Sequence, residues 1–178
     1  MQIEDVRYHV EHIQEQVGRT GEEIVRRAHN EGRVTEQPDE KTAIGQRFEF
    51  KDLDSFTSFT SYLLIRSILN RMLCQLDTLQ GKTKAPLDLE YKRLCRQVWM
   101  CIPLVQGLGL IGGLMFLAPL YVSYEGGNQF EREYVLDFIG QVTDYKGILP
   151  KDRTGLEYLV LETARAWTGR RPLNTAGQ

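Results

Sequence analysis

An uncharged segment in the second half of the chain places the strongest limit on its fold. Positions 97–124 hold no Asp, Glu, Lys or Arg, and Arg96 and Glu125 border this segment. About 20 apolar residues are enough to cross a bilayer as a helix. The segment is therefore buried either in the interior of a protein or in a membrane.

Helix breakers inside positions 97–124 favour the protein interior. Pro103, Gln106 and Pro119 interrupt the segment, together with four glycines. Proline lacks the backbone N–H donor and therefore kinks or ends a helix. We predict two short buried helices, one that ends near Gln106 and one over about 110–123. A single membrane-spanning helix over 97–124 is the alternative.

The composition is that of one folded domain with an ordinary surface. The chain has 178 residues, 42% of them hydrophobic, and a net charge of −2. This balance excludes disorder throughout and a strongly basic surface, so we expect no direct binding of nucleic acid. Three cysteines are too few for a disulfide-stapled secreted domain. Residues 1–17 lack the basic start and apolar run of a secretory signal, so we expect a nuclear or cytoplasmic protein.

Apolar residues at spacings of three and four predict an N-terminal helical segment over 1–32. Gly18 is expected to interrupt its helix, and a capping box of Thr20 and Glu23 to restart it until about Gly32. The apolar seam of this segment has two interpretations. It is either a pairing surface for a partner or a second copy, or an ordinary helix face docked on the core. The seam consists of Ile3, Val6, Val10, Ile13 and Val17.

A polar stretch that includes Pro38 predicts a linker over 33–47. No two alternating segments flank a short turn, so we expect no β-hairpin. The remaining residues divide into a helical core domain over 48–168 and a flexible tail over 169–178. The predicted fold is all-α, an irregular bundle of six to seven helices with no sheet.

The helix after the linker is predicted to be the central one. Asp52 or Asp54 caps its start, and Gly81 ends it. Because few charges interrupt it, most of its circumference should be buried. The charged residues between positions 55 and 80 are Arg66, Arg71 and Asp77.

Capping residues also predict where three later helices begin. Pro103 should kink or end the first of these helices, because a backbone donor is lost there. The capping residues are Asp88 for the first helix, Asn128 with Glu131 for a second, and Thr154 with Glu157 for the last.

The residues that carry chemistry in proteins form no recognisable catalytic constellation. His9 and His12 are three positions apart on the first helix, but a metal site needs further ligands. We interpret both as solvated side chains. Cys95 and Cys101 lack the spacing of a zinc site, and we interpret them as core cysteines. We therefore assign no catalytic, cofactor-binding or metal-binding residue and expect no cofactor.

Aromatic residues of the core domain have two interpretations. Either they pack in an ordinary core, or they line a cavity for a small molecule. A lined cavity would suit a small-molecule effector or the substrate of an enzyme. These residues are Trp99, Tyr121, Tyr124, Tyr134, Tyr145 and Trp167.

Several segments between about 47 and 167, roughly two thirds of the chain, share a pattern with a known protein family. The upstream part of this pattern is a helix that bears Tyr62, Leu69, Asn70 and Leu73. The other segments are 48–50, 91–103, 116–120, 131–139 and 146–148. Together they resemble the far C-terminal region of fungal zinc-binuclear-cluster transcription factors.

The resemblance implies an all-helical regulatory region that lies downstream of a DNA-binding zinc cluster. The six cysteines of that cluster are absent, and the three cysteines of this chain cannot rebuild it. We therefore carry over no metal ligand and no direct contact with nucleic acid. The resemblance instead implies a regulatory module that binds a protein partner, a second copy or a small effector.

Three functional hypotheses follow. The first is a non-catalytic regulatory or protein-interaction module in transcription regulation. The second is a small helical enzyme or accessory protein of a biosynthetic pathway, with an aromatic-lined pocket. The third is a single-pass membrane protein that spans the bilayer through 97–124. We favour the first, and with it a function that is not enzymatic.

Overall fold

The protein is predominantly helical, which confirms the all-α class in its coarse form. The computed structural model describes residues 3–144 and 150–170. Its elements, in chain order, are α1 (Ile3–Asn30), β1 (Val34–Pro38), β2 (Gln46–Phe50), α2 (Leu53–Leu79), α3 (Ala85–Trp99), α4 (Ile102–Gly107), α5 (Gly109–Ser123), the 3-10 turn η1 (Tyr124–Gly126), α6 (Gln129–Asp144) and α7 (Arg153–Trp167).

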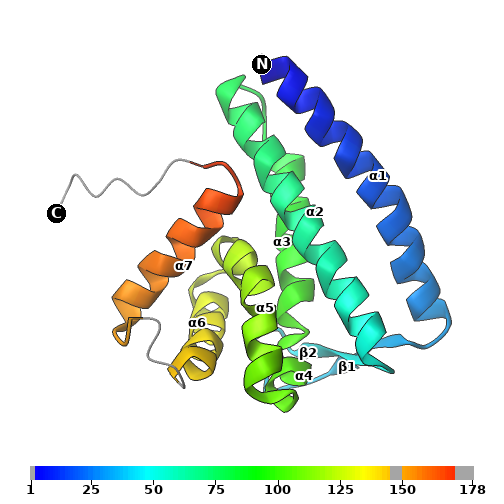
Figure 1. Cartoon of the computed structure of the whole chain (residues 1–178), viewed down its shortest axis with the longest axis vertical. Coiled ribbons are helices and arrows are strands. Elements are labelled where there is room, and N and C mark those ends of the chain that lie inside the picture. Colours follow the sequence, from blue (N-terminus) through cyan, green and yellow to red (C-terminus); the bar gives the residue numbers. More distant parts are fainter. Residues whose placement is uncertain (1–2, 145–149, 171–178) are drawn as a thin grey trace.

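Helix α2 is the central element, as predicted. It contacts α1 on one side, α3 behind it and α5 on the other side (Figure 1). Helices α6 and α7 pack on α5 and η1. The two strands lie at one end of the bundle, beneath the start of α2 (Figure 1).

A β-hairpin replaces most of the predicted linker over 33–47, so the expectation of no sheet was wrong. Strands β1 and β2 pair antiparallel, with Val34 opposite Phe50. Val34 and Phe48 are buried, and the Phe48 amide donates to the Met100 carbonyl at 2.9 Å. These few apolar residues anchor an otherwise polar segment to the core. The division of the chain into domains stays a prediction.

Helix α1 runs through Gly18 without a break, so the expected interruption and the restart at Thr20 and Glu23 were wrong. Gly18 and Gly21 are instead buried against α2. A Cβ atom at Gly21 would lie 2.0 Å from Cδ2 of Tyr62, a distance that no real contact reaches. Glycine therefore serves here for close approach of two helices. The predicted end near Gly32 is confirmed.

The uncharged segment 97–124 is divided among several short elements. Helix α3 ends at Trp99, α4 occupies Ile102–Gly107 and α5 occupies Gly109–Ser123. The predicted pair of short helices is thus confirmed, and the alternative of a single helix over 97–124 does not form. Within residues 3–144 and 150–170, no helix is both long enough and apolar enough to cross a bilayer.

Most apolar residues of the strands and of α2–α7 form one core. Two polar groups inside it have partners: Trp99 Nε1 donates to Ser123 Oγ at 3.0 Å, and the Tyr91 hydroxyl donates to the Val122 carbonyl at 2.5 Å. Satisfied polar groups cost little inside a core. The largest fully buried side chains are Trp99, Tyr124, Phe48, Leu63, Leu94, Ile102, Leu120 and Ile139.

The predicted helix caps are correct in two cases and wrong in two. Asp52 caps α2, where its carboxylate accepts from the Ser55 amide. Asn128 and Glu131 form the reciprocal capping box at α6, with distances of 2.9 and 3.0 Å.

Helix α3 begins at Ala85 rather than at Asp88. Helix α7 is capped by Asp152 instead of Thr154, because the Asp152 side chain accepts from the Gly155 amide. The position of each cap decides which polar side chains stay available for other contacts.

Candidate functional site

The predicted seam of α1 is divided between the interior and the surface. Val6, Val10 and Val17 pack on α2 in a small apolar cluster with Leu69, Leu73 and Leu76. Ile3 and Ile13 remain exposed. Three of the five seam residues are therefore brought together within the chain, and two are left at the surface. A pairing role for this seam stays a prediction.

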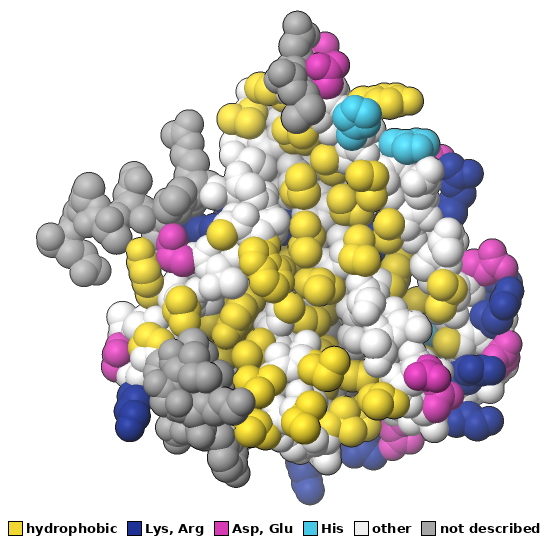
Figure 2. All heavy atoms as spheres, viewed as in Figure 1, with side chains coloured by type: hydrophobic (Ala, Val, Ile, Leu, Met, Phe, Trp, Pro, Cys, Tyr) yellow, Lys and Arg dark blue, Asp and Glu magenta, His cyan; other side chains and the backbone are white. Residues whose placement is uncertain are grey.

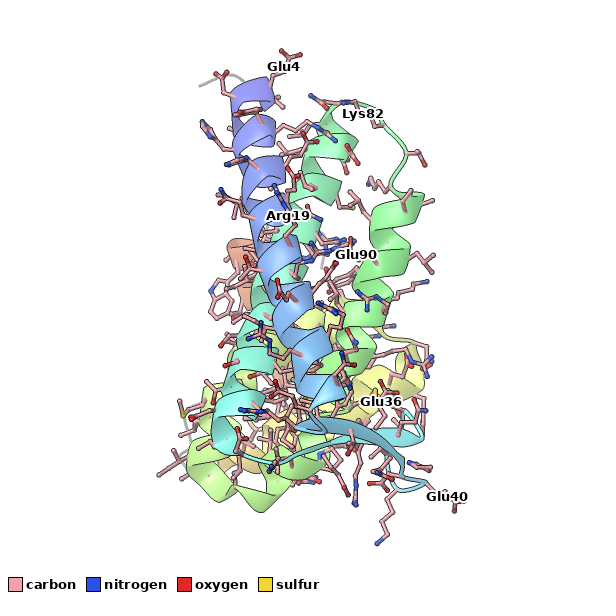
Figure 3. All side chains as sticks on the ribbon, turned by 90° about the vertical axis from the view of Figure 1, so that its right-hand side faces the viewer. Glu4, Arg19, Glu36, Glu40, Lys82 and Glu90 are labelled. Atoms are coloured by element: carbon pink, nitrogen blue, oxygen red, sulfur yellow. The ribbon has the colours of Figure 1, made fainter. Side chains whose placement is uncertain are left out.

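Three of the charged residues of α2 pair with residues of the neighbouring helices. Asp77 pairs with Arg7 of α1 at 2.6 Å, Arg71 pairs with Asp88 of α3 at 2.9 Å, and Arg66 pairs with Glu90 of α3. Figure 3 views this side of the molecule, where Glu90 points from α3 toward α2. A buried charge needs such a partner because it has lost its water. These residues therefore have a structural role.

The cysteines lie in the interior, which confirms their interpretation as core residues. Cys74, Cys95 and Cys101 are free thiols, and all three are buried. Burial raises the pKa of the Cys95 and Cys101 thiols far above its ordinary value, because a buried thiolate would lose its hydration. Thiols of this kind are not nucleophiles at neutral pH.

The histidines lie on or near α1 and do not converge on a ligand. His9 and His12 are exposed, and Nε2 of His12 lies 3.0 Å from Nε2 of Gln16. His29 lies against the rings of Phe48 and Phe59. In the part of the chain that the structure describes, no three His, Cys, Asp or Glu side chains are placed to hold a metal ion.

The aromatic residues that were candidates for lining a cavity are dispersed. Trp99 and Tyr124 are buried in the core, and the Tyr124 hydroxyl donates to Glu157 at 2.7 Å. Tyr121 and Tyr134 are half-buried, Trp167 is exposed, and Tyr145 lies outside the described residues. Core packing accounts for the two that are fully buried.

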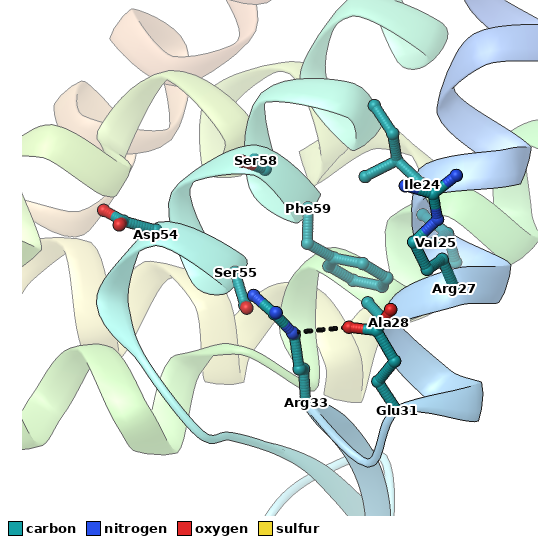
Figure 4. A pocket seen from close by; sticks show the side chains of 10 residues that line it. All are labelled: Ile24, Val25, Arg27, Ala28, Glu31, Arg33, Asp54, Ser55, Ser58 and Phe59. Atoms are coloured by element: carbon teal, nitrogen blue, oxygen red, sulfur yellow. Dashed lines mark ion pairs between the residues drawn. The ribbon is translucent and has the colours of Figure 1, made fainter.

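One surface pocket lies between the end of α1 and the start of α2 (Figure 4) and has a volume of about 320 Å³. Apolar side chains, including Phe59, share its lining with two arginines and two carboxylates. Arg33 and Glu31 pair with each other at 2.7 Å, and Arg27 pairs with Glu23 at 3.3 Å. The charges of this pocket are largely compensated within the chain.

A second pocket, the α2–α5 groove, is uncharged. Its volume is about 330 Å³, and it lies between the first half of α2 and the part of α5 that ends at Pro119. Figure 2 shows hydrophobic side chains gathered over these two helices, with the charged side chains toward the edges of this face. The groove is lined by Leu53, Phe56, Thr57, Thr60, Ser61, Leu64, Leu108, Ile111, Gly112, Met115, Phe116 and Pro119.

The walls of the α2–α5 groove combine a fixed floor with exposed apolar edges. Phe56 and Phe116 are buried, with ring centroids 5.9 Å apart. Ile111 is 74% exposed and Met115 is 77% exposed. Exposed large apolar side chains that adjoin one another mark contact surfaces more often than scattered ones do.

The two threonine hydroxyls in the α2–α5 groove already donate hydrogen bonds. Thr57 Oγ1 donates to the Leu53 carbonyl at 2.9 Å, and Thr60 Oγ1 donates to the Phe56 carbonyl at 2.9 Å. Such bonds to the preceding turn occupy the hydroxyl within its own helix. The threonine methyl groups are then the part of these residues that a ligand meets. The groove offers contact area and no acid, base or activated nucleophile.

Sequence reasoning missed the α2–α5 groove because it assigned the whole uncharged segment to the interior. A signal was present: α5 carries no charged residue on any face. A helix that is apolar all round is expected to be buried all round, yet Ile111 and Met115 face solvent. An apolar helix with one open side is therefore the feature that distinguishes this site.

Comparison of the chain with protein-family models, with curated protein sequences and with solved structures found no significant match in any of the three. The function is accordingly inferred from the residues of this chain.

Proposed function

We propose that this chain is a non-catalytic regulatory or protein-interaction module. Its α2–α5 groove binds the apolar face of a helix from a partner protein. The observation that carries the proposal is the charge-free lining of the groove, with Ile111 and Met115 exposed at its edge. Apolar area that a partner removes from water is the main favourable term in such a contact.

The shape of the groove favours a helical occupant. Four lining residues on or just before α5 recur at spacings of three and four: Leu108, Ile111, Met115 and Pro119. Together they span roughly 16 Å at 1.5 Å per residue. That length matches about three turns of a partner helix, which presents anchors at positions i, i+3 or i+4, and i+7. The flexible Met115 side chain adapts to the shape of such anchors.

The resemblance to the C-terminal region of fungal transcription regulators supports a regulatory role. The partner would then be another regulatory protein, in the nucleus or the cytoplasm, and nucleic acid would not be contacted directly. The chemistry of the groove supports contact over catalysis, because its lining contains hydroxyls but no titratable side chain.

A library of displayed amphipathic helical peptides, selected against the purified chain, tests this proposal. We expect enriched peptides with apolar residues at i, i+3 or i+4, and i+7. Ile111→Glu should weaken their binding at least about tenfold, because a carboxylate would be buried without a partner. The matched control is Leu89→Glu on α3, since Leu89 is also 74% exposed but lies outside the groove. It should leave binding unchanged.

Three results would overturn the proposal. The first is the absence of any enriched peptide, and the second is equal binding to the chain and to its Ile111→Glu variant. The third is a dimer, detected by analytical ultracentrifugation, that Ile111→Glu dissociates and Leu89→Glu does not. That dimer would place a second copy of the chain in the groove and not a partner helix.

A further inference from the structure

A second concave site is strongly charged, in contrast to the uncharged α2–α5 groove. This cationic cleft has a volume of about 420 Å³ and is formed by residues of α2, α3, η1, α6 and α7, and by Arg170 after α7. It contains five cationic side chains and two carboxylates. The cationic residues are Arg71, Lys92, Arg132, Arg165 and Arg170, and the acidic residues are Asp88 and Glu125.

Both carboxylates of the cationic cleft are already compensated. Glu125 is shared by Arg165, at 3.2 Å, and Arg170. Asp88 pairs with Arg71 at 2.9 Å. The carboxylates thus hold three of the five cations in place, and the cleft retains an excess of three positive charges.

Two cations of the cleft have no acidic partner. Among the residues that the structure describes, neither Lys92 nor Arg132 forms an ion pair, although both line the cleft. Arg132 is half-buried at the start of α6, whereas Lys92 is exposed on α3. A partly buried guanidinium without a counter-charge gains from binding an anion, since the pair is weakly screened there.

The floor of the cleft is preorganised. The Arg71 guanidinium lies 3.9 Å from the centroid of the Tyr91 ring. Its nitrogens also donate to Asn70 Oδ1 at 2.7 and 3.1 Å, and to the Leu87 carbonyl at 3.2 Å. A cation fixed in this way loses little conformational entropy when a ligand binds.

We propose that the cationic cleft binds a small organic or inorganic anion that carries at least two negative charges on phosphate or carboxylate groups. Lys92 and Arg132 would contact the anionic groups, because they are the cations not already engaged by a carboxylate. Guanidinium groups bind both phosphate and carboxylate in a two-pronged geometry. Tyr91 and Leu161 supply an apolar wall for the remainder of an organic ligand. This site is separate from the α2–α5 groove and would act as an effector site.

Isothermal titration of the full chain with sodium pyrophosphate and, separately, with sodium citrate tests this inference. Each titration is compared with sodium chloride at the same ionic strength. We expect saturable binding of one anion per chain, and preference for one of the two probes will identify the favoured anionic group. The double variant Lys92→Gln with Arg132→Gln should lose at least about tenfold in affinity.

A control variant with the same change in net charge separates a specific site from general attraction. Lys51→Gln with Arg26→Gln removes two exposed cations that lie outside the cleft and should leave the affinity within about twofold. Arg132→Lys, which keeps the charge, should retain part of the binding. The inference is contradicted if neither probe gives saturable binding, or if the two double variants lose affinity equally. Ile111→Glu should not change anion binding, so the failure of either proposal is distinguishable from that of the other.

Discussion

The two sides of α2 are held by different forces. Toward α1, the contact depends on close approach at Gly18 and Gly21 and on the partly buried pair of Asp77 with Arg7. Toward α5, the contact is apolar and opens at the surface into the α2–α5 groove. The α1 side is complementary in shape and charge, whereas the α5 side leaves apolar area exposed to solvent.

This difference indicates where a partner can bind. Asp77 of α2 and Arg7 of α1 are already paired with each other, so a ligand at this contact would have to compete with the chain itself. The α5 side needs no such exchange, because the side chains of Ile111 and Met115 are largely exposed to water. Surplus apolar area is therefore the property that separates the candidate site from the structural interface.

The largest effect on stability is expected when the apolar contact between α2 and α5 is disrupted. Phe116→Ala removes a buried ring that packs against Phe56 and should lower the free energy of unfolding by about 3–5 kcal/mol. Met115→Ala is the control. The Met115 side chain is next to Phe116 in the sequence but is 77% exposed, so its loss should lower the free energy of unfolding by no more than about 0.5 kcal/mol. Urea unfolding followed by circular dichroism measures both. Equal losses in the two variants would contradict a dry interface at α5.

A smaller effect on stability is expected when the ion pair between α2 and α3 is disrupted. Arg66→Met leaves Glu90 partly buried without its partner and should lower the free energy of unfolding by about 2–3 kcal/mol. Adding Glu90→Met removes the unpaired charge and should restore much of this loss. A double-mutant cycle from urea unfolding measures the coupling. Strictly additive losses would show that the pair makes no contribution of its own.

The smallest effect on stability is expected at the helix contact of α1. Gly21→Ala places a Cβ atom against the Tyr62 ring, and overpacking should outweigh the better helix propensity of alanine, for a net loss of about 1–2 kcal/mol. Gly107→Ala is the control, since a Cβ atom there meets nothing within 4 Å. Thermal unfolding measures the stability of both variants. A Gly21→Ala variant more stable than the unsubstituted chain would refute a tight α1–α2 contact.

Local signals predicted the parts of the fold that local chemistry determines. The caps at Asp52 and at Asn128 with Glu131, and the end of a helix shortly before Pro103, follow from hydrogen-bonding rules within a few residues. The division of 97–124 into short helices follows from its proline and glycine residues. The buried partners of Arg66, Arg71 and Asp77 lie on other helices, so only the burial of these residues was predictable.

The errors arose where distant contacts decide the outcome. A glycine such as Gly18 normally weakens a helix, but α1 continues through this position because it packs on α2, where a Cβ atom at Gly18 would lie 2.7 Å from Nη1 of Arg66. The hairpin over 34–50 has a long polar connection instead of a two-residue turn, and core contacts of Val34 and Phe48 stabilise it. The α2–α5 groove joins residues about 50 positions apart, which no periodicity within one helix reveals.

Amide hydrogen exchange of the full chain, with and without a selected helical peptide, tests the central claim most directly. The peptide should slow exchange in α5 over 108–116 and in α2 over 53–64, and it should leave α1 over 3–30 unchanged. Slowing confined to α1, near Ile3 and Ile13, would contradict the account and would assign the contact surface to the N-terminal seam.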